Sequence, residues 1–392
     1  MAVGYAALGS NTTGAGNVAV GTNALLDSTT GGNNTAVGNN SLFSNITGAD
    51  NTVMGFEGMK ASTTGADNTS VGYQSLYDNS TGSFNASFGH RALFNNTTAS
   101  NNTAVGTSAL FANTTGTQNT ALGQGAAQSN ISGVYNVALG SDSLRDNTTA
   151  NWNVAVGTNA LLLNTTGASN VAIGGLALDA NTTASNNTAV GYSALTTNTT
   201  GANRTAIGFE SSKGSDTETD GTVSVGYRAM YMNSATTADA TDSVAVGYLA
   251  LSATAATTAS LINNTGVGAY ALSFNASTTA TANYNAAVGT SAMQFNANTT
   301  GTVQYNAALG YEALEVNSNT TGTVTNNTAI GYQALKSSSN TSGTIQYNTA
   351  VGSNALDVCV ASNNTAVGAL ALDANTTGGS NTALGQASMT TL

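Results

Sequence analysis

The sequence NNTAVGTSALFANTTG, residues Asn101–Gly116, decides the fold, because near copies of it run along the whole chain. The residue that anchors each copy is the glycine closing the AVG-like triplet. A fixed period of this kind is the signature of a repeat architecture, in which each unit packs against its neighbours. This glycine recurs in twelve steps of 17 residues, one of 18, six of 21, and final steps of 16 and 17, at Gly4 to Gly208, Gly226, Gly247 to Gly352, Gly368 and Gly385.

The residues before each glycine alternate in character, as in Asn102, Thr103, Ala104 and Val105. Alternation with a period of two is typical of a short strand with two unlike faces. The residue directly before the glycine is large and apolar, and the one before that is almost always Ala or Ser. We therefore expect one face to be bulky, and the small Ala/Ser face to allow close approach of other chains.

The second half of the repeat predicts a return of the chain. Ala109 and Leu110 form a shorter apolar element, and Asn113–Gly116 is a turn, since Asn and Gly tolerate left-handed backbone angles. Frequent Gly, Thr and Val make a helix unfavourable. The repeat thus predicts an all-β parallel β-solenoid, or β-roll, with one coil per repeat and strands about 4.8 Å apart. Because the coils are thin, we expect a trimer packed through the Ala/Ser face.

Coil length divides the predicted rod into three parts. Residues 1–208 form 17-residue coils, residues 209–352 form 21-residue coils, and residues 353–392 return to 16- and 17-residue coils, all within one continuous rod. The four extra residues of the long coils lie between the Leu and the next strand. We expect them to enlarge the outer loops, where solenoids usually place their binding variation.

Composition excludes several classes of function. Only 6% of the residues are charged, against roughly a quarter in an ordinary globular protein, and the net charge is -11. An acidic chain without a basic face does not suit nucleic acid. No apolar run approaches the roughly 18 residues of a membrane span, so we expect no membrane insertion. With one histidine and no repeated acid, base or nucleophile, we expect no enzymatic activity and no cofactor.

One acidic stretch is a candidate metal site. In SDTETDG, residues Ser215–Gly221, the side chains of Asp216, Glu218 and Asp220 resemble the start of a calcium loop. The bidentate Glu expected at the twelfth loop position is absent, and Tyr227 stands there. The alternative interpretation is a solvated acidic loop at the junction between the two coil sizes.

Aromatic residues recur in two slots of the repeat, directly after the coil glycine and five residues before it. Stacked one coil apart, they would form ladders. Such ladders suit either sugar stacking on a receptor-binding face or packing between coils and chains, and we favour packing. His90, Arg91 and Cys359 are expected to be ordinary coil residues. The glycan-binding candidates are Trp152, Tyr284, Tyr305, Tyr311, Tyr332 and Tyr347.

The NTAVG motif followed by Ala-Leu resembles the SVAIG repeats in the heads of trimeric autotransporter (YadA-like) adhesins, which are left-handed parallel β-rolls. The 17-residue repeat with NTTG turns is also similar to the shafts of bacteriophage tail fibres. The resemblance implies a homotrimeric fibre or adhesin on a virion or at the cell surface, forming or carrying a surface that binds a bacterial glycan or receptor. The chaperone and anchoring domains that often flank such shafts are not recognisable in this sequence.

Two other functions stay open. A parallel edge invites further pairing, so the chain could stack end to end in an extracellular filament or surface layer. An ice-binding solenoid would need regular Thr and Ala ranks on a flat face. The variation among Thr, Val and Ala in the strand slot weakens such ranks.

Overall fold

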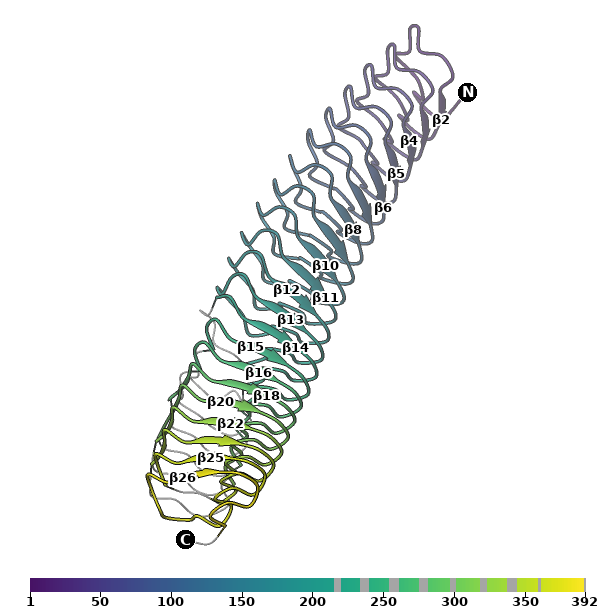
Figure 1. The fold of residues 1–392 in the computed structure, drawn as a ribbon. Coiled ribbons are helices and arrows are strands. Elements are labelled where there is room, and N and C mark those ends of the chain that lie inside the picture. The colour runs from purple at the N-terminus through teal and green to yellow at the C-terminus, as the bar shows by residue number, and fades with distance from the viewer. Residues whose placement is uncertain are drawn as a thin grey trace. The chain divides into compact units, whose positions relative to one another are not determined.

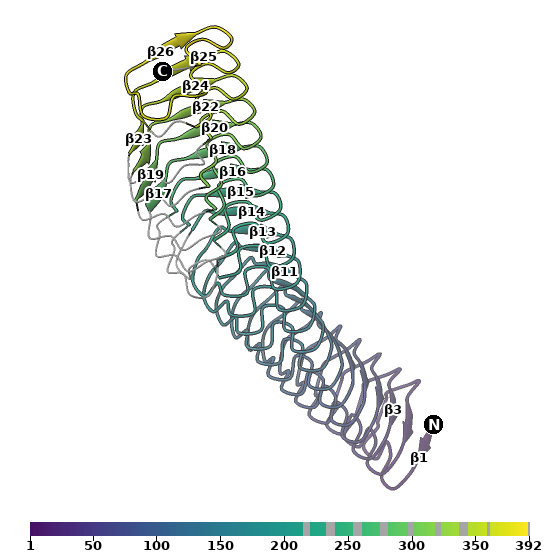
Figure 2. The same cartoon turned by 90° about the horizontal axis from the view of Figure 1, so that it is seen from below.

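The computed structural model describes residues 1–214, 220–232, 240–253, 261–274, 281–296, 301–317, 323–336, 344–358 and 361–390. Within these ranges the chain forms strands and turns and no helix. It divides into two compact units, Met1–Asn187 and Thr188–Leu392. Each unit is a parallel β-solenoid whose coils stack one on the next (Figures 1 and 2), which confirms the predicted fold class.

The first unit contributes one short strand per coil. Each strand pairs in parallel with the strand of the next coil, and partners are one repeat apart, as in Ala104 and Ala121. The sequence offset between paired residues of neighbouring strands therefore equals the 17-residue period of the repeat. The strands are β1 (Ala2–Val3), β2 (Val18–Val20), β3 (Thr35–Val37), β4 (Thr52–Met54), β5 (Thr69–Val71), β6 (Ala86–Phe88), β7 (Thr103–Val105), β8 (Thr120–Leu122), β9 (Val137–Leu139), β10 (Val154–Val156) and β11 (Val171–Ile173).

Every coil of the second unit has this main strand, and four of its coils contribute a further strand to a second sheet. The main strands are β12 (Thr188–Val190), β13 (Thr205–Ile207), β14 (Val223–Val225), β15 (Val244–Val246), β16 (Thr265–Val267), β18 (Ala286–Val288), β20 (Ala307–Leu309), β22 (Thr328–Ile330), β24 (Thr349–Val351), β25 (Thr365–Val367) and β26 (Thr382–Leu384). A second parallel sheet consists of β17 (Thr281–Asn283), β19 (Thr302–Gln304), β21 (Val324–Thr325) and β23 (Ile345–Gln346).

The coil glycine marks a point at which successive coils come close together. Gly106 has φ +130°, and a Cβ placed on it would lie 2.5 Å from the carbonyl oxygen of Gly123 in the next coil. Both the dihedral angle and the space exclude a side chain. The invariant spacing of this glycine is therefore a steric requirement of stacking.

The second half of the coil is a series of turns, without a second strand. In the coil of Gly106, Ser108 and Leu110 both have positive φ, 57° and 51°. A left-handed leucine is uncommon and costs roughly 1–2 kcal/mol. Neighbouring coils hold it in place, because the Leu110 N–H donates to the Ala126 carbonyl at 2.9 Å and the Ser108 N–H donates to the His90 carbonyl at 3.0 Å.

The interior of each coil is narrow. As a result, the small residues of the strand face inward and the bulky residues face outward, which is the opposite of our expectation. Ala104 is fully buried, as are Ala109 and Leu110, whereas Val105 points outward and is partly exposed. Once a leucine fills the coil, the strand residue opposite it is almost always small, with Val53 as the exception. The expectation that the Ala/Ser face forms the contact between chains is therefore wrong, because that face is the core.

Buried asparagines form two ladders inside the coils. The Asn102 Nδ2 donates to the Gly116 carbonyl at 2.9 Å, and its Oδ1 accepts the Asn119 backbone N–H at 2.9 Å. In the second ladder, Asn113 Nδ2 donates to Asn96 Oδ1, also at 2.9 Å. These amides satisfy the turn carbonyls that would otherwise be buried unpaired. Aligned hydrogen bonds of this kind strengthen one another.

The 21-residue coils have a wider core. Phe274 and Phe295 are buried and stack with their ring centroids 5.1 Å apart, in a row of parallel bridges that runs from Met232 to Val316. Part of the inserted sequence thus adds apolar interior and the second sheet. The segments between these elements, such as 297–300, lie outside the described residues, so an enlarged outer loop there stays a prediction.

Completing a broken asparagine ladder should stabilise the first unit. Ser62 occupies the row of Asn113, and neither its Oγ nor Asn45 Oδ1 has a hydrogen-bond partner among the described residues. Asparagine at this position can donate to Asn45 and accept from Asn79. We expect Ser62→Asn to raise the free energy of local opening by about 1–2 kcal/mol, measured by hydrogen exchange of these coils.

Ser44→Asn is the matched control, because Ser44 is only partly buried and lies outside the ladder. It should leave exchange unchanged. Equal protection of the two variants would contradict the role of the ladder.

Candidate functional site

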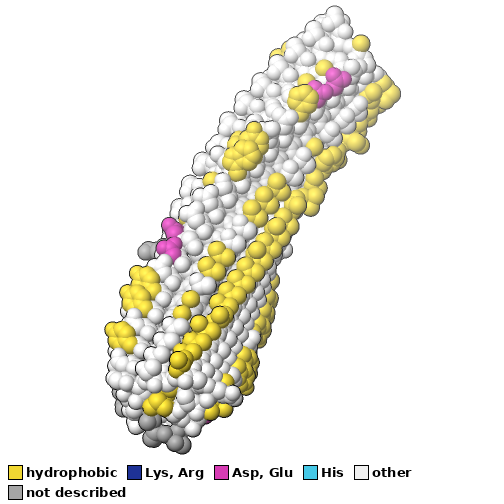
Figure 3. Space-filling model, in the orientation of Figure 1, with side chains coloured by type: hydrophobic (Ala, Val, Ile, Leu, Met, Phe, Trp, Pro, Cys, Tyr) yellow, Lys and Arg dark blue, Asp and Glu magenta, His cyan; other side chains and the backbone are white. Residues whose placement is uncertain are grey.

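The strongest surface feature is a row of bulky apolar side chains on the outer face of the main strands, here called the outer row. Among its members, the side chain of Phe88 is 39% exposed, that of Met54 is 48% exposed and that of Leu122 is 52% exposed. Rows of hydrophobic side chains are visible along the surface in Figure 3. The outer row consists of Val3, Val20, Val37, Met54, Val71, Phe88, Val105, Leu122, Leu139, Val156 and Ile173 in the first unit, and Val190, Ile207, Val225, Val246, Val267, Val288, Leu309, Ile330, Val351, Val367 and Leu384 in the second.

The sheet carrying the outer row is free of charge. None of the strands formed by the described residues contains Asp, Glu, Lys, Arg or His. Beside each outer-row residue lies a Thr, Val or Ala two positions earlier, also facing outward. A partner could cover this face without burying an ionised group. Burying such a group costs free energy, because the charge loses its hydration.

Exposed aromatic rings lie alongside the outer row in three places, here called the aromatic strips. They follow the outer row by two residues, so each Cα lies within about 7 Å of an outer-row Cα. Their centroids stack at 5.1–5.7 Å, and their interplanar angles do not exceed 16°. The strips are Phe56–Tyr73–His90, Tyr192–Phe209–Tyr227–Tyr248 and Tyr311–Tyr332.

The glycan candidates do not form a single site. Tyr284 stacks on Tyr305 at 5.2 Å, and Trp152 stacks on Tyr135 at 4.0 Å. Rings stacked coil on coil cover one another's faces and present edges to solvent, whereas a sugar packs on a ring face. Contact through a ring face is therefore confined to the ends of each ladder. All six candidates are exposed, with Trp152 at 58% and Tyr347 at 60%.

Ion pairs accompany the aromatic strips, a feature that the sequence analysis missed. Glu210 pairs with Lys213 at 2.6 Å and with Arg228 at 2.7 Å, and the Arg228 guanidinium lies over the rings of Tyr227 and Tyr231 at 5.3 and 4.9 Å. The signal was present in the sequence: Glu at the second position after the coil glycine, and Lys three residues later. The first strip has the same pair, formed by Glu57 and Lys60.

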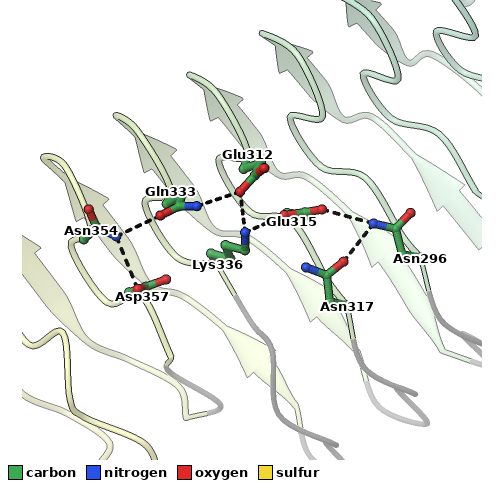
Figure 4. Close-up of polar contacts among 8 residues, drawn as sticks. All are labelled: Asn296, Glu312, Glu315, Asn317, Gln333, Lys336, Asn354 and Asp357. Carbon is green, nitrogen blue, oxygen red and sulfur yellow. Dashed lines mark hydrogen bonds and ion pairs between the residues drawn. The ribbon is translucent and has the colours of Figure 1, made fainter.

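A network of charged and amide side chains crosses the long coils of the second unit (Figure 4). Lys336 pairs with both Glu312 and Glu315, and the Gln333 Nε2 donates to Glu312 Oε2 at 2.7 Å. Burial opposes ionisation of Glu312, but the hydrogen bonds from Lys336 and Gln333 outweigh it and lower the pKa of Glu312 to about 2. Asn354 extends the row by donating to Gln333 at 3.1 Å.

Asp216 and Glu218 of the calcium candidate lie outside the described residues, as does Cys359. Asp220 is described, and its Oδ1 accepts the Ala202 backbone N–H at 2.6 Å. Across the described ranges, no group of three His, Cys, Asp or Glu side chains could hold a metal ion. His90 stacks on Tyr73, and the Arg91 Nε donates to Gln74 at 3.1 Å.

Comparison of the chain with protein-family models, with curated proteins and with solved structures finds no match in any of the three. In the described part of the chain, no helix is long and apolar enough to span a membrane. Inferences about function therefore depend on the surface features described above.

Acid should loosen the coils around Glu312 before the rest of the second unit. Its folded-state pKa of about 2 lies below the ordinary value of 4.5, so its contribution to stability is complete above pH 4.5 and is lost as the pH falls towards 2. Hydrogen exchange corrected for intrinsic rates should show falling protection in this interval. Glu312→Gln should remove the pH dependence, and a variant that keeps it would contradict the assignment.

Proposed function

We propose that the chain is a non-enzymatic structural shaft of a fibre or adhesin, in which copies pack side by side through the outer row. The observation that carries this proposal is the uncharged row of half-exposed bulky side chains, one in every coil of each unit. Contiguous apolar surface of this extent is typical of an interaction site. The contact between copies is thus reassigned from the Ala/Ser face to the opposite face of the same strands.

The repeat period favours a second copy of the chain as the partner. Outer-row residues recur once per coil, at the spacing of paired parallel strands, about 4.8 Å. Only a partner with the same axial spacing can meet every one of them. Covering a half-exposed Val, Leu or Met contributes on the order of 1 kcal/mol. Summed over many coils, this exceeds the cost of association, which is estimated at 4–15 kcal/mol.

We infer a trimer with the role of a phage tail-fibre-like shaft, on a virion or at a cell surface. Three copies present every exposed ring three times, so weak contacts with a bacterial glycan or receptor would combine through avidity. The ladder ends, such as Trp152, are where a sugar can reach a ring face. Length at constant cross-section is what the repeat provides, and no catalytic step is assigned.

Light scattering of the purified chain over a dilution series tests this proposal. One chain has a mass of 38.7 kDa, and we expect a particle of three chains whose mass does not change on dilution. Mass that grows with concentration would favour the end-to-end filament instead. A stable monomer would contradict side-by-side packing and favour a single-faced role such as ice binding.

Polar substitution of the outer row should dissociate the particle without unfolding it. We expect Met54→Thr, Phe88→Thr and Leu122→Thr together to lower the particle mass or make it dilution-dependent, with an unchanged circular dichroism spectrum. Ile46→Thr and Ile131→Thr form the matched control, because both side chains are exposed, at 44% and 46%, but lie in the turns. Loss of the particle in the control would contradict the assignment of the interface.

A further inference from the structure

Packing through a uniform row leaves the axial register of the copies poorly defined. Outer-row residues differ little from coil to coil, so a copy displaced by one coil still places a bulky side chain against a bulky side chain. Such a slip loses the contact of one coil only. Repetitive strands with nearly identical faces are prone to slippage for this reason. A shaft with a defined register needs features that do not repeat.

The aromatic strips are such features. In the first unit, stacked rings follow the coil glycine at Phe56, Tyr73 and His90, and a single ring follows it at Tyr5, while the same slot in later coils holds short side chains such as Thr107 and Thr158. A slipped copy would place rings beside these short side chains. Aligned copies would bring rings together, and aromatic pairs contribute more than their buried area alone.

We propose that the aromatic strips fix the axial register in which copies of this chain pack, so that parallel copies align coil for coil. This inference rests on the side-by-side packing proposed above. The strips lie beside the outer row in three places, and Tyr73, Phe209 and Tyr227 are 43%, 41% and 39% exposed. A neighbouring chain that packs against the outer row can therefore also contact the rings of the strips.

The ion pairs beside the strips make them suitable for burial. Within one chain, Glu210 is already paired with Lys213 and Arg228, so covering the second strip would not bury the Glu210 carboxylate without a partner. Arg228 is held over two tyrosine rings. Tyr and Arg in fixed positions are the residue types that dominate binding energy at interfaces, with well-packed neighbours excluding water.

Distances between spin labels on different chains test the register. Two single-cysteine chains, Thr47→Cys and Thr149→Cys, each in a Cys359→Ser background, carry the label in exposed turns six coils apart. Mixed and co-assembled, they should give one narrow interchain distance between the unlike sites, with an axial part of about 29 Å, beside the shorter distance between like sites at the same level. In the strip variant, all nine strip residues become Thr. We expect this variant to keep its mass and add distances offset by multiples of about 5 Å.

The control variant removes aromatic rings at the other end of the strand, replacing them with the Asn common in that row. It should retain the single distance. Persistence of that distance in the strip variant, or equal broadening in the control, would overturn the assignment of register. A monomeric wild-type chain would overturn the packing itself, which the particle mass reports separately. The control positions are Phe84, Tyr135, Trp152, Tyr284, Tyr305 and Tyr347.

Discussion

The close approach of coil glycines is the constraint on which the rest of the structure depends. At Gly106, a positive φ and a neighbouring carbonyl oxygen 2.5 Å from the site of a Cβ leave room for hydrogen only. Stacked glycines let successive coils pair at strand spacing. Each of the remaining repeat positions then lies directly above the same position in the preceding coil. Strands, asparagine amides and aromatic rings therefore each form a ladder. One steric requirement, repeated in each coil, thus generates all the long-range order within a unit.

Stacking also decides which side chains face inward. Because each coil is closed by tight left-handed turns, its interior holds a leucine, two alanines and two asparagine amides, as around Leu110. Bulky strand residues are left outside. What would be a core face in a larger sheet becomes an exposed apolar row, and this row is the basis for proposing packing between copies. The longer coils relax the restriction, and phenylalanines such as Phe274 enter the core.

The period, the parallel stacking and the strand position could be predicted from the sequence, because a 17-residue repeat fixes the register once coils stack. Which side of the strand faces the interior of the coil could not be predicted. Alternation in Thr103-Ala104-Val105 indicates two unlike faces but not which one is inside, and that depends on the width of the coil. Of the candidate site, the stacking of Tyr284 on Tyr305 followed from spacing. The network of Glu312 and Lys336 did not, because charged residues occupy these positions in only a few coils and form no recurring row in the sequence.

The most direct test of the glycine constraint is Gly106→Ala, compared with Gly116→Ala in the turn of the same coil. A Cβ on Gly116 would also come close to the next coil, 2.3 Å from the Gly133 carbonyl oxygen, but Gly116 does not have a positive φ, and the turn row already carries alanine at Ala99 and Ala150. Hydrogen exchange of the flanking coils gives the free energy of local opening. We expect a loss of at least about 2 kcal/mol for Gly106→Ala, from backbone strain at a positive φ, and a clearly smaller loss for Gly116→Ala. Equal, small effects of both substitutions would contradict the account.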